Sequence, residues 1–389
     1  MFHRVNEFST PPLDKLNQIA RLTIAFGLQS EDHRPDAQIR TDFVGYFTRA
    51  GHPNAGAWLW RKRVVIKAPL LELMKRPLAE KNAILAGFDT DFDVRACFAS
   101  GHFCYSDIPE NESRRLVAEI LQGFYDPILR EQGVPENISG ESAVFNRQSY
   151  LRRYILTQNL QVCPACDGQP PSVDQFAGMI REDVDHFFPK AKYPFFSIHP
   201  QNLIPICKTC NQDYKNDKDA LSDAEADVAD VTSLHHIFHP VFEPAIESVD
   251  VIIATDQSSQ RPHLSIRPRN DDPLARARIN SLNYTLGIES RWNGNLAEGR
   301  LEKPIRGYLF YSTMYERLHD TLDSDQLRGR FARIGAAMSG DIGAVPNAVA
   351  VAVFAKWLAD EQSETARDKR LQLARTALNL NSPQTTQAP

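Results

Sequence analysis

Two pairs of cysteines with the same short spacing stand out in this sequence. Cys163 and Cys166 are separated by two residues, and so are Cys207 and Cys210. This spacing lets a tight turn aim both sulfurs of a pair at one ion, and two such turns complete a tetrahedral zinc site with Zn–S distances of about 2.3 Å. The sequence therefore predicts a structural zinc site, and four free buried thiols are the weaker alternative. Nearby lysines would offset the negative charge of four thiolates: Lys190, Lys192, Lys208 and Lys215.

An Asp-His dipeptide, Asp185-His186, lies between the two cysteine pairs in an apolar stretch that ends at Pro189. We expect this stretch to be a strand, in which adjacent side chains point to opposite faces. Asp185 and His186 would then address opposite ends of one phosphodiester, as in-line displacement at phosphorus requires. Asp185 would hold a hard divalent cation such as Mg²⁺ or Mn²⁺. His186 would take a proton from water, since imidazole titrates near neutral pH.

The segment after this dipeptide supplies further polar groups. Asn202 begins an apolar stretch, residues 202–206, that we expect to return as a second strand, and residues 207–218 are expected to begin a helix. Asn211 would lie in the first turn of that helix, where its side-chain oxygen offers the divalent metal a second ligand. Lys215, one turn further, would reach a phosphate, and Lys218 is its rival for that contact.

Each of these residues carries little weight by itself. An Asp-His pair is more often a surface pair than a catalytic one, and an asparagine before leucine is more often a turn cap. The order and spacing of the whole set favour a hydrolytic site. The alternative that stays open is a zinc module that binds nucleic acid without chemistry. His235, His236 and His239 offer a second metal site, although a polar connector is the simpler interpretation. His199, which precedes Pro200 between the two expected strands, is expected to be exposed.

Residues 163–218, about a seventh of the chain, resemble the HNH endonucleases, which have the ββα-metal fold. The cysteine pairs match the zinc-binding four-cysteine variant of that family. Asp185-His186 matches its Asp-His pair, Asn202 its middle asparagine, and Asn211 its third motif position, where many members have histidine. The family's lysine often follows that third position by three residues, whereas Lys215 follows Asn211 by four.

The resemblance implies a metal-dependent enzyme that hydrolyses DNA, less often RNA, to a 5′-phosphate and a 3′-hydroxyl. In such an enzyme His186 is the general base, Asp185 and Asn211 hold the catalytic metal, and Asn202 positions the catalytic loop. The longer string over residues 185–211 is similar to a bacterial subgroup from mobile-element and phage-defence loci, which includes the nuclease partner of an ATPase in Septu-type systems. We therefore expect a role in antiviral defence, and a nuclease held inactive until a partner or signal arrives is an alternative to constitutive cleavage.

The elements that must position these residues divide into three regions and a tail. Residues 1–140 are expected to form a mainly helical domain, and residues 141–245 the HNH module with its structural zinc. Residues 246–378 are expected to be an α+β region for sensing or partner binding, with two strands joined by a polar turn. Residues 379–389 are rich in Gln, Thr and Pro and are expected to be disordered. The expected fold class is α+β, mainly helical, around a central ββα-metal module.

Composition limits the remaining possibilities. In 389 residues, 42% are hydrophobic and 24% charged, as in globular proteins, and no apolar run is long enough to span a bilayer. The first residues have no apolar stretch typical of a secretory signal, and six cysteines are too few for a disulfide scaffold, so we expect a cytoplasmic protein. The net charge of −5 excludes a global basic field. Between residues 146 and 218, however, nine basic residues stand against seven acidic ones, which leaves room for a phosphate-facing patch.

Overall fold

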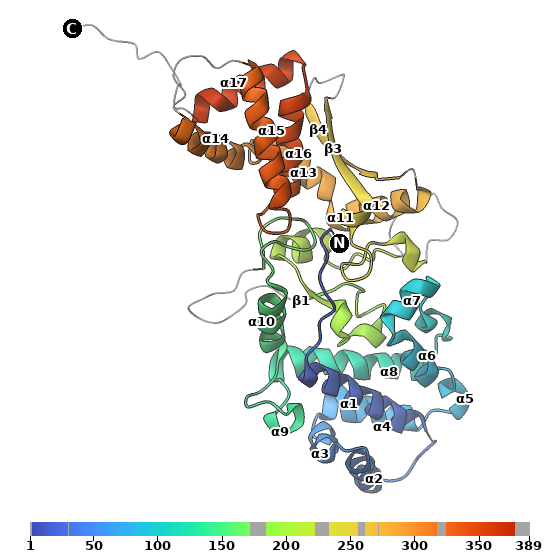
Figure 1. Ribbon diagram of the computed structural model, residues 1–389. Coiled ribbons are helices and arrows are strands. Elements are labelled where there is room, and N and C mark those ends of the chain that lie inside the picture. Colours follow the sequence, from blue (N-terminus) through green and yellow to red (C-terminus); the bar gives the residue numbers. More distant parts are fainter. Residues whose placement is uncertain are drawn as a thin grey trace, which may run out of the picture.

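The computed structural model describes residues 2–29, 31–171, 184–221, 233–255, 261–270, 272–316 and 324–377 (Figure 1). The expected disordered tail, residues 379–389, lies outside the described residues. Within them the chain is mainly helical and contains two separate two-stranded antiparallel sheets. The prediction of a mainly helical α+β protein is therefore confirmed in this coarse form.

The N-terminal part of the chain is helical, and its elements are α1 (Pro11–Leu28), α2 (Asp36–Arg49), α3 (Pro53–Trp60), η1 (Arg63–Lys67), α4 (Ala68–Met74), α5 (Leu78–Lys81), α6 (Ile84–Asp91), α7 (Val94–Ser100), η2 (Cys104–Asp107), α8 (Glu112–Gly123), η3 (Phe124–Gln132), α9 (Glu136–Ser139) and α10 (Arg147–Gln158). The middle part holds β1 (Val184–His186), η4 (Pro194–Phe196), η5 (Pro200–Asn202), β2 (Leu203–Pro205), η6 (Thr209–Lys215) and η7 (Leu234–His236). The C-terminal part holds α11 (Ala245–Ser248), β3 (Val249–Thr255), β4 (Pro262–Pro268), α12 (Pro273–Leu286), α13 (Ile288–Ala297), α14 (Glu302–Glu316), α15 (Ser324–Gly340), α16 (Ala348–Asp360) and α17 (Glu364–Ala377). The η elements are short 3₁₀-helices, except η1, η3 and η6, which are π-helices.

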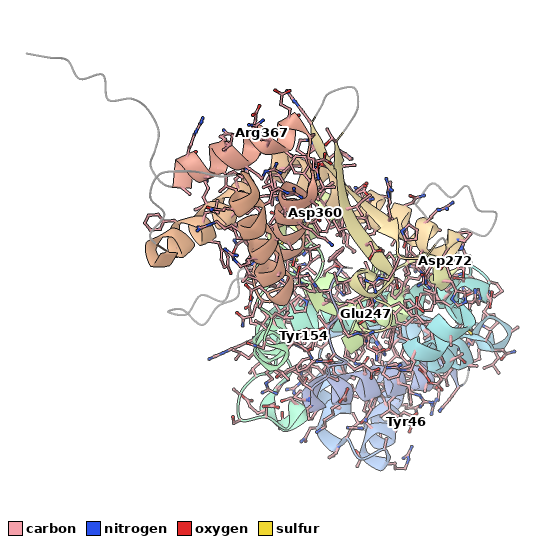
Figure 2. The ribbon with its side chains drawn as sticks, turned by 45° about the horizontal axis from the view of Figure 1, so that its top comes forward. Tyr46, Tyr154, Glu247, Asp272, Asp360 and Arg367 are labelled. Atoms are coloured by element: carbon pink, nitrogen blue, oxygen red, sulfur yellow. The ribbon has the colours of Figure 1, made fainter. Side chains whose placement is uncertain are left out.

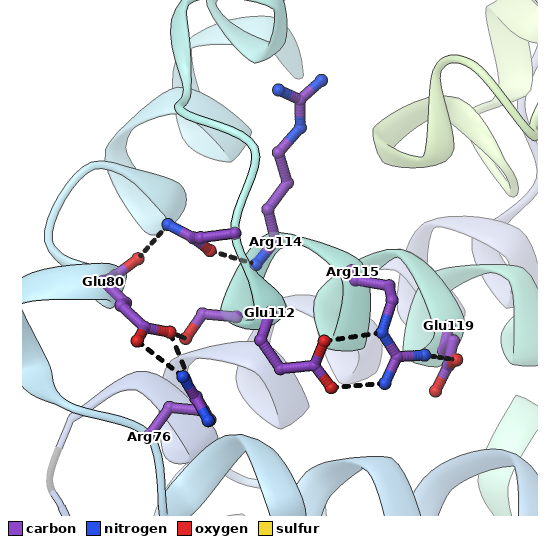
Figure 3. Close-up of polar contacts among 8 residues, drawn as sticks. Arg76, Glu80, Glu112, Arg114, Arg115 and Glu119 are labelled. Carbon is purple, nitrogen blue, oxygen red and sulfur yellow. Dashed lines mark hydrogen bonds and ion pairs between the residues drawn. The ribbon is translucent and has the colours of Figure 1, made fainter.

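Helix α8 shows how the N-terminal helices are held in place (Figure 3). Asn111 caps the helix by accepting a hydrogen bond from the amide of Arg114, and its own side-chain amide donates to the carbonyl of Glu80. Farther along the helix, Arg115 forms ion pairs with Glu112 and Glu119. The opposite face is apolar and packs into the core. Through Gln122, this helix also contacts Lys190 next to the candidate site.

The described residues form two hydrophobic cores. One is built mostly from residues 5–155, and the other mostly from residues 163–377. The middle part of the chain contributes to both, because side chains alternate along a strand. In β2, Leu203 packs into the first core and Ile204 into the second. The short β1–β2 ribbon thus lies where the two cores meet, between the N-terminal helices and the C-terminal elements (Figure 1).

The C-terminal part begins with the expected pair of strands. β3 and β4 pair in an antiparallel register from Val249 opposite Pro268 to Thr255 opposite Pro262. α16 packs against β3 and against α15, and α17 adds to the same layer. Figure 2 shows Asp360 and Arg367 on these last helices, far from Tyr46 in the N-terminal helices. The prediction of two strands in this region is confirmed.

The N-terminal segment lies between the two halves rather than at one end (Figure 1). The amide of Phe2 donates to the carbonyl of Pro164, 3.0 Å away, and the amide of Ile246 donates to the carbonyl of Phe2. The ring of Phe2 packs edge-on against Trp292, with ring centroids 5.1 Å apart. The first residues therefore connect the first cysteine turn to the C-terminal part.

Candidate functional site

The four cysteines of the two pairs come together in one buried cluster. Their sulfur atoms all lie within 4.8 Å of one another. The sulfur of Cys163 is 4.0 Å from that of Cys210, and the sulfur of Cys166 is 3.9 Å from that of Cys207. A tetrahedral zinc ion with bonds of about 2.3 Å holds its sulfurs about 3.8 Å apart. Because both the donor set and its spacing fit, this cluster can hold a metal ion such as zinc.

Tight turns and backbone amides shape the cluster. The amide of Asp167 donates to the carbonyl of Cys163 at 3.0 Å, and Asp167 has a left-handed backbone with φ of 60°. The amide of Gly168 then points at the sulfur of Cys166, 3.4 Å away, and the amide of Cys207 points at the sulfur of Cys163, 3.2 Å away. N–H donors of this kind stabilise thiolates and orient metal ligands. The two-residue spacing thus produces the local turns that the sequence led us to expect.

A distant arginine, which the sequence did not point to, supplies a positive charge next to the sulfurs. Arg291 of α13 places Nη1 2.9 Å from the sulfur of Cys210, and its guanidinium lies over the ring of Tyr214, 4.6 Å from the centroid. Burial alone would lower the pKa of Arg291, but the negative thiolates outweigh burial and raise that pKa. The guanidinium therefore remains charged.

The nearby lysines that were expected to offset the thiolates mostly pair with carboxylates instead: Lys190 with Asp126, Lys192 with Asp219 and Lys215 with Asp185. That expectation is corrected, because carboxylates lie within reach of these side chains in the folded chain.

A buried His-Asp contact ties the first cysteine turn to the N-terminal segment and to the start of α16. Nε2 of His3 is 2.6 Å from Oδ1 of Asp167, and the second carboxylate oxygen accepts the amide of Val349 at the start of α16. Burial raises the pKa of Asp167, while His3 works in the opposite direction. No sequence pattern indicated this contact, because its three partners are far apart along the chain.

The Asp-His dipeptide lies in β1, and its two side chains face opposite ways, as expected. β1 pairs with β2 so that Asp185 lies opposite Ile204 and His186 opposite Leu203. His186 faces the N-terminal helices, where Tyr125 of η3 packs edge-on against the imidazole with centroids 4.3 Å apart. Asp185 faces η6 on the other side. The two halves of the predicted site therefore lie on the two faces of one short ribbon.

A backbone carbonyl defines which nitrogen of His186 carries a proton. Nε2 of His186 lies 3.0 Å from the carbonyl oxygen of Ser197. A carbonyl only accepts hydrogen bonds, so Nε2 is the protonated nitrogen and Nδ1 is left as the proton acceptor. Burial lowers the pKa of His186 to about 3, and the charge of Lys190 adds to this effect. The imidazole is therefore neutral at physiological pH, and the expectation that it titrates near neutral pH is corrected, because the folded chain buries it.

The side chain of Asn202 forms hydrogen bonds that hold the loop carrying Ser197. Its side-chain oxygen accepts the amide of Phe188 at 2.6 Å, and its side-chain nitrogen donates to the carbonyls of Phe188 and Phe196, each at 3.0 Å. Asn202 is 1% exposed, so these three hydrogen bonds satisfy a group that has no access to water. They also correct an expectation: β1 ends at His186 rather than at Pro189, because Phe188 bonds to this side chain instead of a strand partner.

Lys215 lies against Asp185 rather than at the surface. Its Nζ is 2.8 Å from Oδ1 of Asp185 and donates to the carbonyl of His186, also at 2.8 Å. Both residues are nearly inaccessible, at 3% and 2% exposure. Oδ2 of Asp185 is buried and has no hydrogen-bond partner among the described residues. Burial raises the pKa of Asp185, and the charge of Lys215 offsets part of that rise.

The helix after the last cysteine is a π-helix, which is shorter than expected. η6 covers Thr209–Lys215 and ends where the amide of Asn216, with φ of 46°, donates to the carbonyl of Asn211. Lys215 follows Asn211 by four residues, one more than the spacing of three that is frequent in the HNH endonucleases. The wider turn of a π-helix accommodates this additional residue. Among the described residues no hydrogen bond joins the side chain of Asn211 to Asp185, so its role as a metal ligand stays a prediction. Lys218 donates to the carbonyl of Tyr284.

Among the described residues, His235, His236 and His239 do not form a second metal site, and His199 and His239 are buried. His199, expected to be exposed, is 3% exposed and its Nε2 lies 3.0 Å from the carbonyl of Phe92. His239 is fully buried among phenylalanines, and burial lowers its pKa strongly. His235 and His236 belong to η7, so no continuous helix gives His235 and His239 a common face. Among the described residues, the cysteine cluster alone groups three or more residues of the kind that bind metals.

Comparisons with known proteins add one partial similarity. No family model matches the chain, and no solved structure matches it. The chain is 35% identical over 65 residues to protein ea31 of Escherichia phage lambda, a stretch that covers 17% of this chain and 19% of the phage protein. The chain thus matches about a fifth of the length of this relative. Among the described helices, none is both long enough and apolar enough to cross a membrane.

Proposed function

We propose that residues 163–218 form a metal-dependent endonuclease site of the HNH type that hydrolyses phosphodiester bonds of DNA. The observation that carries this proposal is the hydrogen-bonded chain from Asn202 through the 188–202 loop to Ser197 and His186. It leaves Nδ1 of a neutral imidazole as the proton acceptor on one face of a ribbon whose other face presents a carboxylate. A general base and a metal-binding carboxylate on opposite sides are what in-line hydrolysis requires.

In the proposed reaction, His186 takes a proton from a water molecule through Nδ1 while its Nε2–H stays bonded to Ser197. The water oxygen forms a bond to phosphorus, and the bond from phosphorus to the 3′ oxygen breaks. The leaving 3′ oxygen takes a proton from solvent, so that a 5′-phosphate and a 3′-hydroxyl result. The loop held by Asn202 keeps the imidazole in one orientation. The neutral state of His186 allows it to accept the proton.

Asp185 and Asn211 would hold the catalytic Mg²⁺ or Mn²⁺. The unpartnered, buried Oδ2 of Asp185 fits such a role, because a buried carboxylate oxygen without a partner is costly unless a cation or donor completes it. The bound metal would supply charge stabilisation on the leaving-oxygen side. The four cysteines would hold the structural zinc that joins the ribbon to η6.

A gated form of the same nuclease is the second candidate, and the Lys215–Asp185 ion pair favours it. In that form, the buried ammonium is bonded to the carboxylate that the metal would need. A setting in bacterial defence against phage or foreign DNA, with a partner ATPase or another signal as the trigger, rests on the resemblance of residues 163–218 alone. A zinc module that binds nucleic acid without cleaving it is the remaining alternative to both forms of the nuclease.

Nicking of supercoiled plasmid by the full chain, with Mg²⁺ or Mn²⁺ and with EDTA as the control, tests the proposal. Cleavage that needs the divalent ion supports it. Zinc-loaded, folded protein that leaves the plasmid intact under every divalent condition would favour the gated nuclease. DNA binding that is unchanged in His186→Ala and needs no divalent ion besides zinc would instead point to the non-catalytic module.

A further inference from the structure

A half-exposed cationic cluster lies on the His186 face of the ribbon, at the boundary with the N-terminal helices. Lys190, four residues after His186, places its ammonium over the ring of Tyr125, 5.2 Å from the centroid. The same ring packs against the imidazole of His186. The lysine, the tyrosine and the base therefore form one continuous set of contacts.

A single carboxylate holds two cations in this cluster. Oδ2 of Asp126 is 2.8 Å from Nζ of Lys190, and its Oδ1 is 3.2 Å from Nη1 of Arg130. Asp126 has an extended backbone that interrupts η3, and Arg130 lies in the part of η3 beyond this interruption. Two positive charges against one negative charge leave the cluster with an excess of one.

The cations remain within reach of solvent, unlike Lys215. The side chain of Lys190 is 29% exposed and that of Arg130 is 47% exposed, whereas that of Lys215 is 4% exposed. The backbone of Lys190 is held by α8, because the side-chain amide of Gln122 donates to its carbonyl at 3.3 Å. A partly exposed ammonium that is held next to an aromatic ring suits contact with a phosphate oxygen.

From this arrangement we propose that Lys190 and Arg130 bind a backbone phosphate of the nucleic acid, next to the phosphodiester that His186 addresses. This inference rests on the proposed function for the position of the substrate, and it moves the phosphate contact from Lys215 to Lys190. It also gives the N-terminal helices a role: η3 and α8 complete the nucleic-acid surface of the nuclease module.

The test measures DNA binding without cleavage. In a His186→Ala background, a labelled short duplex is titrated by fluorescence anisotropy at several salt concentrations between about 50 and 200 mM. Because both cations address one phosphate, Lys190→Gln with Arg130→Gln should reduce the slope of log affinity against log salt by about 0.9, and Lys190→Gln alone should remove part of that. Lys190→Arg should keep the slope of the parent protein.

Lys192→Gln is the matched control, because Lys192 lies two residues away and is 45% exposed but points to Asp219 on another side. Its slope should equal that of the parent. Equal slopes for the parent and the double variant, or no DNA binding by the parent, would overturn the inference. Plasmid nicking by the wild type is scored separately: a reduced slope without any nicking would count against the nuclease while supporting the phosphate contact.

Discussion

The ammonium of Lys215 lies 2.8 Å from Oδ1 of Asp185, and both side chains are buried. In the proposed nuclease this carboxylate is a ligand of the catalytic metal. In the structure, however, one of its oxygens is already paired with the ammonium of Lys215. The second oxygen has no partner among the described residues. A divalent ion that binds both oxygens must compete with Lys215, and this competition is measurable.

Lys215→Met should raise the affinity of the zinc-loaded protein for Mn²⁺ by tenfold or more, on the order of 1.4 kcal/mol. The substitution removes the competing cation and leaves a buried carboxylate whose charge a metal ion can compensate. Isothermal titration calorimetry with Mn²⁺ measures the change, and Asp185→Asn combined with Lys215→Met should abolish binding. An affinity equal to that of the wild type would show that Lys215 and the metal do not share the carboxylate.

Arg291→Met should weaken zinc binding by about 10- to 100-fold, the usual effect of removing a group that supports a metal ligand. The guanidinium is bonded to the sulfur of Cys210 and offsets the charge of the thiolates. A competitive zinc chelator measures the affinity, and Arg291→Lys should lose less because it keeps the positive charge. Cys207→Ser, in contrast, should unfold the module, because a structural zinc contributes about 10 kcal/mol or more. If Arg291→Met retained wild-type zinc affinity, the arginine would have no part in the metal centre.

Asn202→Ala should lower the free energy of unfolding by about 2–4 kcal/mol, since it removes three buried hydrogen bonds and leaves backbone groups unpaired. Urea denaturation measures the loss. Gln201→Ala, next to it and partly buried, is the control and should cost much less. Cleavage should be lost in Asn202→Ala at temperatures where the protein remains folded, because the Ser197 carbonyl no longer orients His186. A stable and fully active Asn202→Ala protein would show that these hydrogen bonds do not hold the loop that orients His186.

The free energy of unfolding should fall with acid between about pH 6.5 and 4. Burial lowers the pKa of His199 from 6.5 to about 4, so above pH 6.5 the imidazole is neutral in both states. Between these values the unfolded chain takes up the proton and the folded chain does not, which costs about 1.4 kcal/mol per pH unit for such a group. Below pH 4 the contribution stops changing.

His199→Gln should remove roughly 1–3 kcal/mol of this acid sensitivity, because an amide does not titrate in this range. Urea denaturation at several pH values measures it, and a variant of the exposed His33, His33→Gln, should behave as the wild type. An identical pH dependence in His199→Gln and wild type would assign the loss to other groups.

Local features of the site could be predicted from the sequence. The two-residue cysteine spacing dictates tight turns, so the four sulfurs were expected together and are found together. Strand alternation placed Asp185 and His186 on opposite faces, and the structure has them so. The strands β3 and β4 and the helices α1 and α8 also follow from period and capping residues.

Contacts between distant segments could not be predicted. Arg291 reaches the cysteine cluster from α13, and Tyr125 reaches His186 from η3, and neither contact leaves a pattern in a single sequence. The ion pair of Lys215 with Asp185 was also not predicted. Helical spacing indicates on which face of a helix a lysine lies, but not which carboxylate packs against that face. His199 looked exposed because it precedes a proline in a loop, yet the aromatic residues around that loop bury it.

The most direct test of the central claim compares single-turnover nicking of supercoiled plasmid by wild type and His186→Ala, with Mn²⁺ present and zinc content measured in both. We expect nicking by the wild type, none by His186→Ala, and equal zinc content and melting temperature. Equal nicking by the two proteins would contradict the assignment of His186 as the general base.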